Sequence, residues 1–375
     1  MSVDLFIFAG EKSADIHGER LLKALKTDFP QLTVVGVGGP GMRAAGMTSI
    51  LKMEQFQVMG FIDVFASLPS LIRHFYVVSR AIERLQPKLV VTIDYPGFNL
   101  RMHRHLRKKG FTGKICHYIC PSVWAWGKKR IPLMAKNLDL LLTILPFEKE
   151  LFAHTRLPVA YVGNPLVEKI QSYTYKPLKM ATDKNIIALF PGSRKKEIER
   201  NLALQLQVCK NFPDFHVAIS LSDEQFAPLI EAIMQKEGFS QHETSIIPGN
   251  FSYELMRAAH CAIAKSGTVT LELALHRTPT VVTYGLSALD LFIARDLLRI
   301  RLPFYCLVNI IAGKEIFAEL IGPNFTYASL LAKVNALLDP SHYAQCQRGC
   351  DEVIVQLGDR NAAQEAAQQL KEYLM

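Results

Sequence analysis

The sequence lacks any long hydrophobic run, and none approaches the roughly 20 apolar residues that cross a bilayer as a helix. The first ten residues are apolar but carry no basic n-region, and no small-residue cleavage site follows them. We therefore expect a first strand there and a cytoplasmic protein. The seven cysteines have no zinc-binding spacing, which favours reduced, mostly buried thiols over a disulfide framework or a metal site.

Several common functional motifs are also missing. No GxxxxGKS/T segment is present, which disfavours a P-loop ATPase, and the glycines of residues 36–41 are wrongly spaced for a GxGxxG fingerprint. The sequence has no GxSxG elbow for a nucleophilic serine and no Asp-x-Asp element to hold a metal. We therefore expect neither a metal ion nor another cofactor.

What is present is an alternation of short apolar runs and helical patterns over 375 residues, a length that suits two domains. Runs of Val, Ile, Leu and Phe predict buried parallel strands. They lie at residues 3–9, 33–37, 89–94, 114–119 and 140–144, and again at 186–190, 216–220, 245–247, 261–264 and 280–284. This succession predicts an α/β protein with two Rossmann-like, doubly wound lobes.

A polar stretch after residue 163 marks the expected connection between the lobes. We place an N-terminal lobe at residues 1–165 and a C-terminal lobe at 166–340. The tail at 341–375 is expected to form helices that pack back on the N-terminal lobe or on a partner chain. Because ligands of such sheets lie at the carboxyl ends of the strands, we expect the functional site in the cleft between the lobes.

The loop after the first strand of the second lobe has the composition of an anion site. Gly192 lets backbone amides approach a ligand, Ser193 suits a helix N-cap, and Arg194 begins a run of three cations. Cations oppose the positive end of a helix dipole, and a bound diphosphate would relieve that conflict. A solvated basic first turn is the plainer alternative.

A second loop of this lobe has a similar character. Ser266, Gly267 and Thr268 follow a strand and open a helix, where they could hold phosphate. Glu272, in the next turn, could accept hydrogen bonds from two ribose hydroxyls. The two loops together predict a site for a nucleotide diphosphate, although Glu272 could equally be a residue that complements the helix dipole.

The first lobe offers two weaker candidates. Gly10 permits a tight turn after the first strand, and the amides that follow could receive an anion or a polar sugar group. Asp94 ends a very apolar strand, where a desolvated carboxylate could act as a general base. A capping role ahead of the next helix is the alternative for Asp94.

Residues 59–78 carry apolar side chains around more of a helix than one core-facing stripe requires, with arginines close by. The formal net charge of +9 suits an anionic partner, such as a membrane surface, a phosphorylated substrate or a nucleic acid, but a generally solvated basic surface explains it equally well. The segment could bind acyl chains or a membrane, or it could be a well-buried helix. The residues concerned are Met59, Phe61, Val64, Phe65, Leu68, Leu71 and Ile72.

Together these segments resemble the lipid-A-disaccharide synthase family, over nearly the whole chain and in the family's order. The most specific match is Pro-Ser-Val-Trp-Ala-Trp at 121–126. The others lie at 9–15, 36–42, 58–60, 93–99, 145–148, 191–194, 266–272 and 309–313. The resemblance implies an inverting glycosyltransferase with the two-lobed B-type fold. Such an enzyme couples UDP-2,3-diacylglucosamine to 2,3-diacylglucosamine 1-phosphate, giving a β(1→6) disaccharide and UDP at the inner membrane.

The resemblance also implies roles for individual residues. Asp94 matches an essential acidic residue, Arg194 an essential arginine of the nucleotide site, and Asn309 a polar residue of the cleft. In the first loop, Gly10, Glu11 and Ser13 match substrate-contacting positions, although Lys12 and Ala14 depart from the usual small residues.

The expected partners are the UDP-sugar donor, the sugar phosphate acceptor and the anionic surface of the inner membrane, with a possible homo-oligomer and no nucleic acid. A UDP-N-acetylglucosamine 2-epimerase, or another B-type transferase, is the nearest enzymatic alternative. A basic membrane- or nucleic-acid-binding module without catalytic activity is the alternative from another class.

Overall fold

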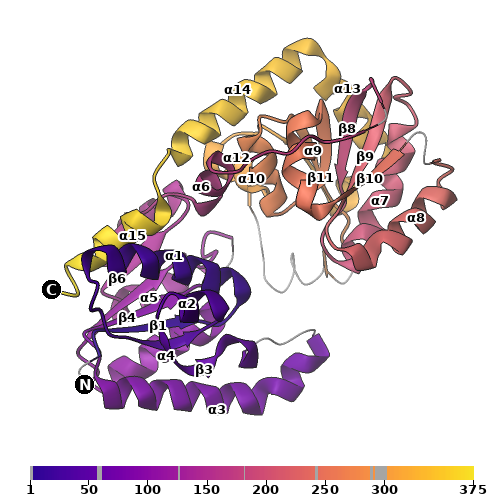
Figure 1. Cartoon of the computed structure of the whole chain (residues 1–375). Coiled ribbons are helices and arrows are strands. Elements are labelled where there is room, and N and C mark those ends of the chain that lie inside the picture. The colour runs from indigo at the N-terminus through magenta and orange to yellow at the C-terminus, as the bar shows by residue number, and fades with distance from the viewer. Residues whose placement is uncertain are drawn as a thin grey trace. The chain divides into compact units, whose positions relative to one another are not determined.

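A computed structural model of the chain describes residues 3–56, 61–125, 127–180, 182–240, 244–287, 290–291 and 302–375, without the side chains of 61–68. The chain forms two compact units (Figure 1). The first comprises Met1–Glu168 and Asp359–Met375, and the second comprises Lys169–Gly358. The boundaries at 165 and 340 stay predictions.

The first unit is built on a seven-stranded parallel sheet in the order β3-β2-β1-β4-β5-β6-β7. The strands are β1 (Leu5–Ala9), β2 (Val34–Gly38), β3 (Thr48–Lys52), β4 (Leu89–Ile93), β5 (Lys114–Tyr118), β6 (Leu140–Thr143) and β7 (Val159–Tyr161). Parallel strands need crossover connections, and the intervening helices supply most of them.

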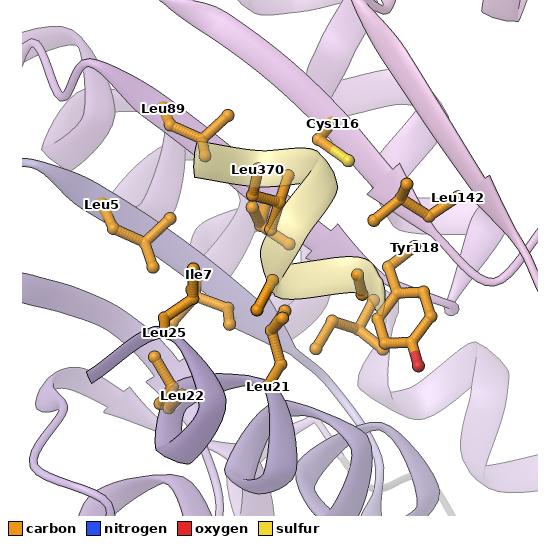
Figure 2. Close-up of a cluster of buried hydrophobic side chains, with 14 of the residues drawn as sticks. Leu5, Ile7, Leu21, Leu22, Leu25, Leu89, Cys116, Tyr118, Leu142 and Leu370 are labelled. Atoms are coloured by element: carbon orange, nitrogen blue, oxygen red, sulfur yellow. The ribbon is translucent and has the colours of Figure 1, made fainter. Parts of the chain in front are cut away.

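Both faces of this sheet are covered by helices, as the apolar runs in its strands require. Leu5 and Ile7 of β1 face a core formed with α1 (Lys12–Asp28) and α15 (Ala362–Lys371), whereas Phe6 and Phe8 face the opposite core. Figure 2 shows Leu370 of α15 among the leucines of α1 and the strand residues, so the end of the chain completes the core of the first unit.

The opposite core lies under α3 (Phe61–Leu85), α4 (Pro96–Lys108) and α5 (Arg130–Asn137). The remaining helices of the unit are α2 (Pro40–Ala44), α6 (Pro165–Gln171) and the 3₁₀ segments Met53–Gln55 and Pro146–Phe152. No helix in the described ranges has both the length and the apolar character that crossing a membrane requires.

The second unit repeats the plan with a six-stranded parallel sheet in the order β10-β9-β8-β11-β12-β13. Its strands are β8 (Asn185–Phe190), β9 (Phe215–Leu221), β10 (Thr244–Pro248), β11 (Cys261–Lys265), β12 (Thr280–Tyr284) and β13 (Ala318–Ile321). Its helices are α7 (Lys195–Cys209), α8 (Ala227–Lys236), α9 (Ser252–Ala258), α10 (Thr268–Leu275), α12 (Leu307–Ala312), α13 (Tyr327–Leu338) and α14 (Pro340–Leu357).

Each sheet reverses its strand order once, between β1 and β4 in the first unit and between β8 and β11 in the second. Loops that leave neighbouring strands at such a point diverge to opposite faces, which opens a crevice at the carboxyl ends of the strands. The fold therefore provides one potential ligand site in each unit.

Candidate functional site

A cavity of about 380 Å³ lies at the point of strand reversal in the second unit. It is lined by the loops that follow β8, β9, β10 and β11 and by the first turns of α9 and α10. Six residues expected to bind a nucleotide line it: Gly192, Ser193, Ser266, Gly267, Thr268 and Glu272. The fold thus brings together two segments that lie more than 70 residues apart in sequence.

The turn after β8 requires glycine. Gly192 has a φ of 132°, which side-chain-bearing residues rarely adopt, and a Cβ built there would lie 2.5 Å from the Cβ of Glu197. Ser193 was expected to cap α7, but Arg194 occupies the N-cap position and makes no side-chain cap. The backbone N–H of Ser193 instead donates to Glu197 Oε2 at 3.0 Å, so the buried glutamate organises the turn.

Glu197 also contacts two cations, of which Lys265 lines the cavity and Arg194 does not. Its Oε1 lies 3.1 Å from Lys265 Nζ and 3.3 Å from Arg194 Nη1. Burial alone would raise the pKa of Glu197, but the hydrogen bonds from Lys265 and Ser193, with the charges of Lys265 and Arg194, hold it below the ordinary value. The side chain of Arg194 remains 81% exposed and can still turn to an anion.

The second loop presents a helix start without a side-chain cap. Gly267 is the N-cap of α10, and no side chain accepts a hydrogen bond from its first turn. The first amides of a helix have no acceptor within the helix, so they are suited to an anion. α7 likewise begins without a side-chain cap from its N-cap residue. The first turns of two helices and the side chain of Lys265 therefore lie at one cavity.

Glu272 lines the same cavity one turn into α10. The hydroxyl of Tyr253, a buried residue of α9, donates a hydrogen bond to Glu272 Oε1 at 2.8 Å. Burial raises the pKa of Glu272, while the Tyr253 hydrogen bond and the charge of Lys169 counteract that rise. The tyrosine fixes one carboxylate oxygen and leaves the glutamate with further capacity to accept hydrogen bonds.

A second cavity, of about 620 Å³, lies at the point of strand reversal in the first unit. Glu11 and Asp94, which follow β1 and β4, contribute two carboxylates, and Arg101 of α4 contributes a cation. Its wall is mainly apolar and aromatic, and α3 contributes Leu71, Ile72, Phe75 and Tyr76. The cavity therefore combines carboxylates with a surface that suits hydrocarbon.

Asp94 is held in a strained turn. Asp94 and Tyr95 both have positive φ, 48° and 49°, where non-glycine residues are uncommon. The turn is fixed because the Asp94 N–H donates to Tyr118 O at 2.9 Å and Asn99 Nδ2 donates to Asp94 O at 2.6 Å. Burial first, and then the charge of Glu11, raises the pKa of Asp94 from 3.8 to about 6. Such a carboxylate is suited to taking a proton near neutral pH.

The loop after β1 lies against this turn. A Cβ at Gly10 would approach Tyr95 Cδ1 to 3.1 Å, so the glycine permits the close packing. Glu11 is the N-cap of α1, and the Ser13 hydroxyl donates to its Oε1 at 2.6 Å. Gly10, Glu11 and Ser13 therefore lie beside Asp94 in one unit, while their contact with a substrate stays a prediction.

Of the other expected site residues, Asn309 takes no part in these contacts. Asn309 is fully buried and its amide is fully used: Nδ2 donates to Phe317 O and Glu319 Oε1, and Oδ1 accepts from the N–H groups of Ile316 and Phe317. Met59 lies outside the described residues. Phe61, Val64, Phe65 and Leu68 belong to α3, but their side chains are not described.

Three residues that form or support the cavity of the second unit were not expected from the sequence alone. Glu197 and Tyr253 act through contacts that exist only in the fold, and Lys265 is the last residue of β11, ahead of the predicted glycine loop. A charged residue that ends an otherwise apolar strand was the one signal available for Lys265.

The chain is similar to proteins of known family. A sequence model described as lipid-A-disaccharide synthetase matches residues 5–373. The lipid-A-disaccharide synthase of Chlamydia pneumoniae is 44% identical over 324 residues, 84% of this chain and 53% of that protein. The enzyme of that name from Coxiella burnetii is 32% identical over 373 residues, 97% of this chain and 96% of that protein. The chain thus spans about half the length of the first of these relatives.

Among solved structures, the kitacinnamycin glycotransferase matches with a TM-score of 0.63 at 12% identity, covering 100% of both chains. That likeness concerns the fold. With the two parallel sheets, it confirms the predicted B-type glycosyltransferase architecture of two Rossmann-like units.

Proposed function

The chain belongs to the lipid-A-disaccharide synthase family, and from this premise we propose that it transfers 2,3-diacylglucosamine from UDP-2,3-diacylglucosamine to 2,3-diacylglucosamine 1-phosphate. The products are the β(1→6) disaccharide 1-phosphate and UDP. The observation that carries the proposal is the contrast between the two cavities. One offers amides and cations for a diphosphate, and the other offers a carboxylate of raised pKa beside an apolar wall.

The donor's nucleotide is assigned to the cavity of the second unit. The diphosphate would receive the first amides of α7 and α10 with the side chains of Arg194 and Lys265. Glu272, held by Tyr253, would accept hydrogen bonds from the ribose hydroxyls. As the bond to the sugar breaks, negative charge grows on the departing diphosphate, and these fixed donors stabilise it.

The acceptor is assigned to the cavity of the first unit. Asp94 takes the proton of the acceptor 6-hydroxyl as its oxygen attacks the anomeric carbon of the donor. A bond forms between this oxygen and the anomeric carbon, the bond from that carbon to the UDP oxygen breaks, and the bonding electrons leave with UDP. Attack opposite the leaving group inverts the anomeric configuration. Leu71, Phe75 and Tyr76 offer apolar surface for acyl chains.

The exposed side chains of α3 support a location at the inner face of the inner membrane. Ile72 and Tyr76 of α3 are each 49% exposed, and Arg73 and Arg80 are exposed on the same helix. Exposed apolar groups beside cations suit an anionic lipid surface. Sedimentation with vesicles tests this: binding should require anionic lipid and should weaken when Ile72 and Tyr76 are both replaced by serine.

The activity itself is tested by incubating the protein with synthetic donor and acceptor and analysing the products by mass spectrometry. We expect the disaccharide phosphate and UDP in equal amounts, both dependent on the acceptor. A C2 epimer formed without acceptor would instead assign the protein to the epimerases. Failure of the UDP-sugar to raise the unfolding temperature would indicate a catalytically inert module.

A further inference from the structure

Arg101 lines the acceptor cavity as a cation that has no anionic partner among the residues the structure describes. It lies on α4 and lines the cavity together with Glu11, Asp94 and the aromatic side chains of α3. Its one hydrogen bond among the described residues runs from Nη1 to Gly97 O at 3.0 Å, within the same helix. Among the cavity-lining residues that the structure describes, Arg101 is the only cation.

The contact with Gly97 orients the guanidinium without neutralising it. A backbone carbonyl carries no net charge, and the guanidinium has five N–H donors in a planar fork, so most of them stay available. This fork matches the oxygens of a phosphate, with which arginine forms paired, charge-assisted hydrogen bonds. This exposed side chain borders a cavity of about 620 Å³, so a ligand there can reach the free donors.

Arg101 and Asp94 reach the same cavity from one helix and from the turn that precedes it. The helix begins at Pro96, directly after the turn that holds Asp94, and Arg101 lies five residues further on. At 1.5 Å per residue this is a rise of about 7.5 Å between the Cα atoms of Pro96 and Arg101, about 1.4 turns. Because Asp94 and Arg101 line the same cavity of about 620 Å³, one ligand in this cavity can meet both side chains.

We propose that Arg101 binds the phosphomonoester of the acceptor and so determines which end of the acceptor sugar meets Asp94. The inference rests on the proposed function, and it adds a binding residue that distinguishes a phosphorylated acceptor from a neutral one. Three chemical features of the cavity then match three parts of one ligand. Asp94 receives the hydroxyl, the α3 side chains receive the acyl chains, and Arg101 receives the phosphate.

The test compares two acceptors and four proteins in neutral detergent micelles. The acceptors are synthetic 2,3-diacylglucosamine 1-phosphate and the same sugar with a free 1-hydroxyl. The proteins are wild type, Arg101→Gln, Arg101→Lys and Arg104→Gln, where Arg104 is an exposed arginine of α4 that does not line the cavity. KM and kcat are measured for each combination of protein and acceptor. The UDP affinity of each protein is also measured, to check that the nucleotide cavity of the second unit is intact.

Wild type should prefer the phosphorylated acceptor. Arg101→Gln should raise KM for this acceptor by about 10- to 100-fold, the loss expected for a charge-assisted hydrogen bond, and should leave the 1-hydroxyl acceptor almost unchanged. Arg101→Lys should restore part of the preference because it keeps the charge without the fork. Arg104→Gln should match wild type, and UDP affinity should be equal in all four proteins.

Three results would overturn the inference, and they can be told apart. If wild type forms disaccharide and Arg101→Gln keeps its full preference for the phosphate, the inference fails and the proposed function stands. If wild type forms no disaccharide from either acceptor, the proposed function fails and the inference fails with it. If Arg101→Gln loses binding to anionic vesicles but keeps its acceptor preference, the anion bound by Arg101 is a lipid headgroup, and the assignment to the acceptor is wrong.

Discussion

Replacing Asp94 with asparagine should make the first unit more stable. Raising the pKa of a carboxyl from 3.8 to about 6 costs about 3 kcal/mol of folding free energy once the group is ionised in both states. The amide of asparagine carries no charge to desolvate, and asparagine tolerates the positive φ of this position. We therefore expect Asp94→Asn to gain about 1–3 kcal/mol at pH 7.5, the lower figures reflecting partial solvent access.

The sign of the effect fixes its pH dependence. Because the folded-state pKa is the higher one, the unfolded chain ionises first, and wild type loses stability as the pH rises from about 4 to about 6. The gain of the variant should be near zero at pH 4 and complete above pH 6. Urea unfolding followed by tryptophan fluorescence measures it, since both tryptophans fall within residues 1–168.

A charge-neutralising variant elsewhere in the same unit supplies the control. Asp139 forms ion pairs with Arg107 and Lys114 and accepts the Ile115 N–H, so Asp139→Asn should lower stability at pH 7.5. If Asp94→Asn proves no more stable than wild type at pH 7.5, or if its gain persists unchanged at pH 4, the carboxylate is not the strained, desolvated group described above.

Three further predictions concern packing and the nucleotide cavity. Gly36→Ala would place a Cβ 1.9 Å from Ile7 O and should lower the free energy of unfolding by about 1–3 kcal/mol or more in a urea titration. Gly97→Ala is the control: its added Cβ would have no atom within 4 Å, so the free energy of unfolding should not change. Gly192→Ala should weaken UDP binding about 5- to 100-fold by calorimetry because of backbone strain, while Gly238→Ala, at a φ of 73° outside the cavity, should bind UDP normally. Tyr253→Phe should weaken UDP binding about 2- to 12-fold, because Glu272 loses one hydrogen bond. Tyr175→Phe removes a hydroxyl that is bonded to His276 instead, and it should leave UDP binding unchanged. Equal UDP affinities of the two variants would contradict the assignment of Glu272.

The sequence predicted the inner strands of both sheets and the edge strand β10, and it missed the other three edge strands. β1 is apolar throughout and β4 is apolar except for Thr92, because alternate residues enter two cores. β3, β7 and β13, which lie at sheet edges, were not predicted, since they are mostly half-exposed and carry no continuous apolar run. Short edge strands have no periodic signal strong enough to separate them from loops.

The site was predicted where its residues are consecutive and missed where the fold assembles it. Gly192 and Gly267 are recognisable because a strand, a glycine and a helix follow one another in the sequence. The contact between Tyr253 and Glu272 depends on how α9 and α10 pack, which no local pattern contains. Asp15 is a similar case: it accepts the N–H groups of Gly39, Gly41 and Met42, so two separate family motifs prove to be one hydrogen-bonded unit.

The central claim is that the two cavities divide one reaction, with UDP held in the second unit and the acceptor deprotonated by Asp94 in the first. The most direct measurement is disaccharide formation by Asp94→Asn, together with UDP binding to the same preparation. We predict that UDP affinity equals that of wild type, that kcat falls by about 10²- to 10⁴-fold, and that wild-type activity declines below pH 6 as Asp94 takes up a proton. Near-full transfer by the variant would contradict the claim.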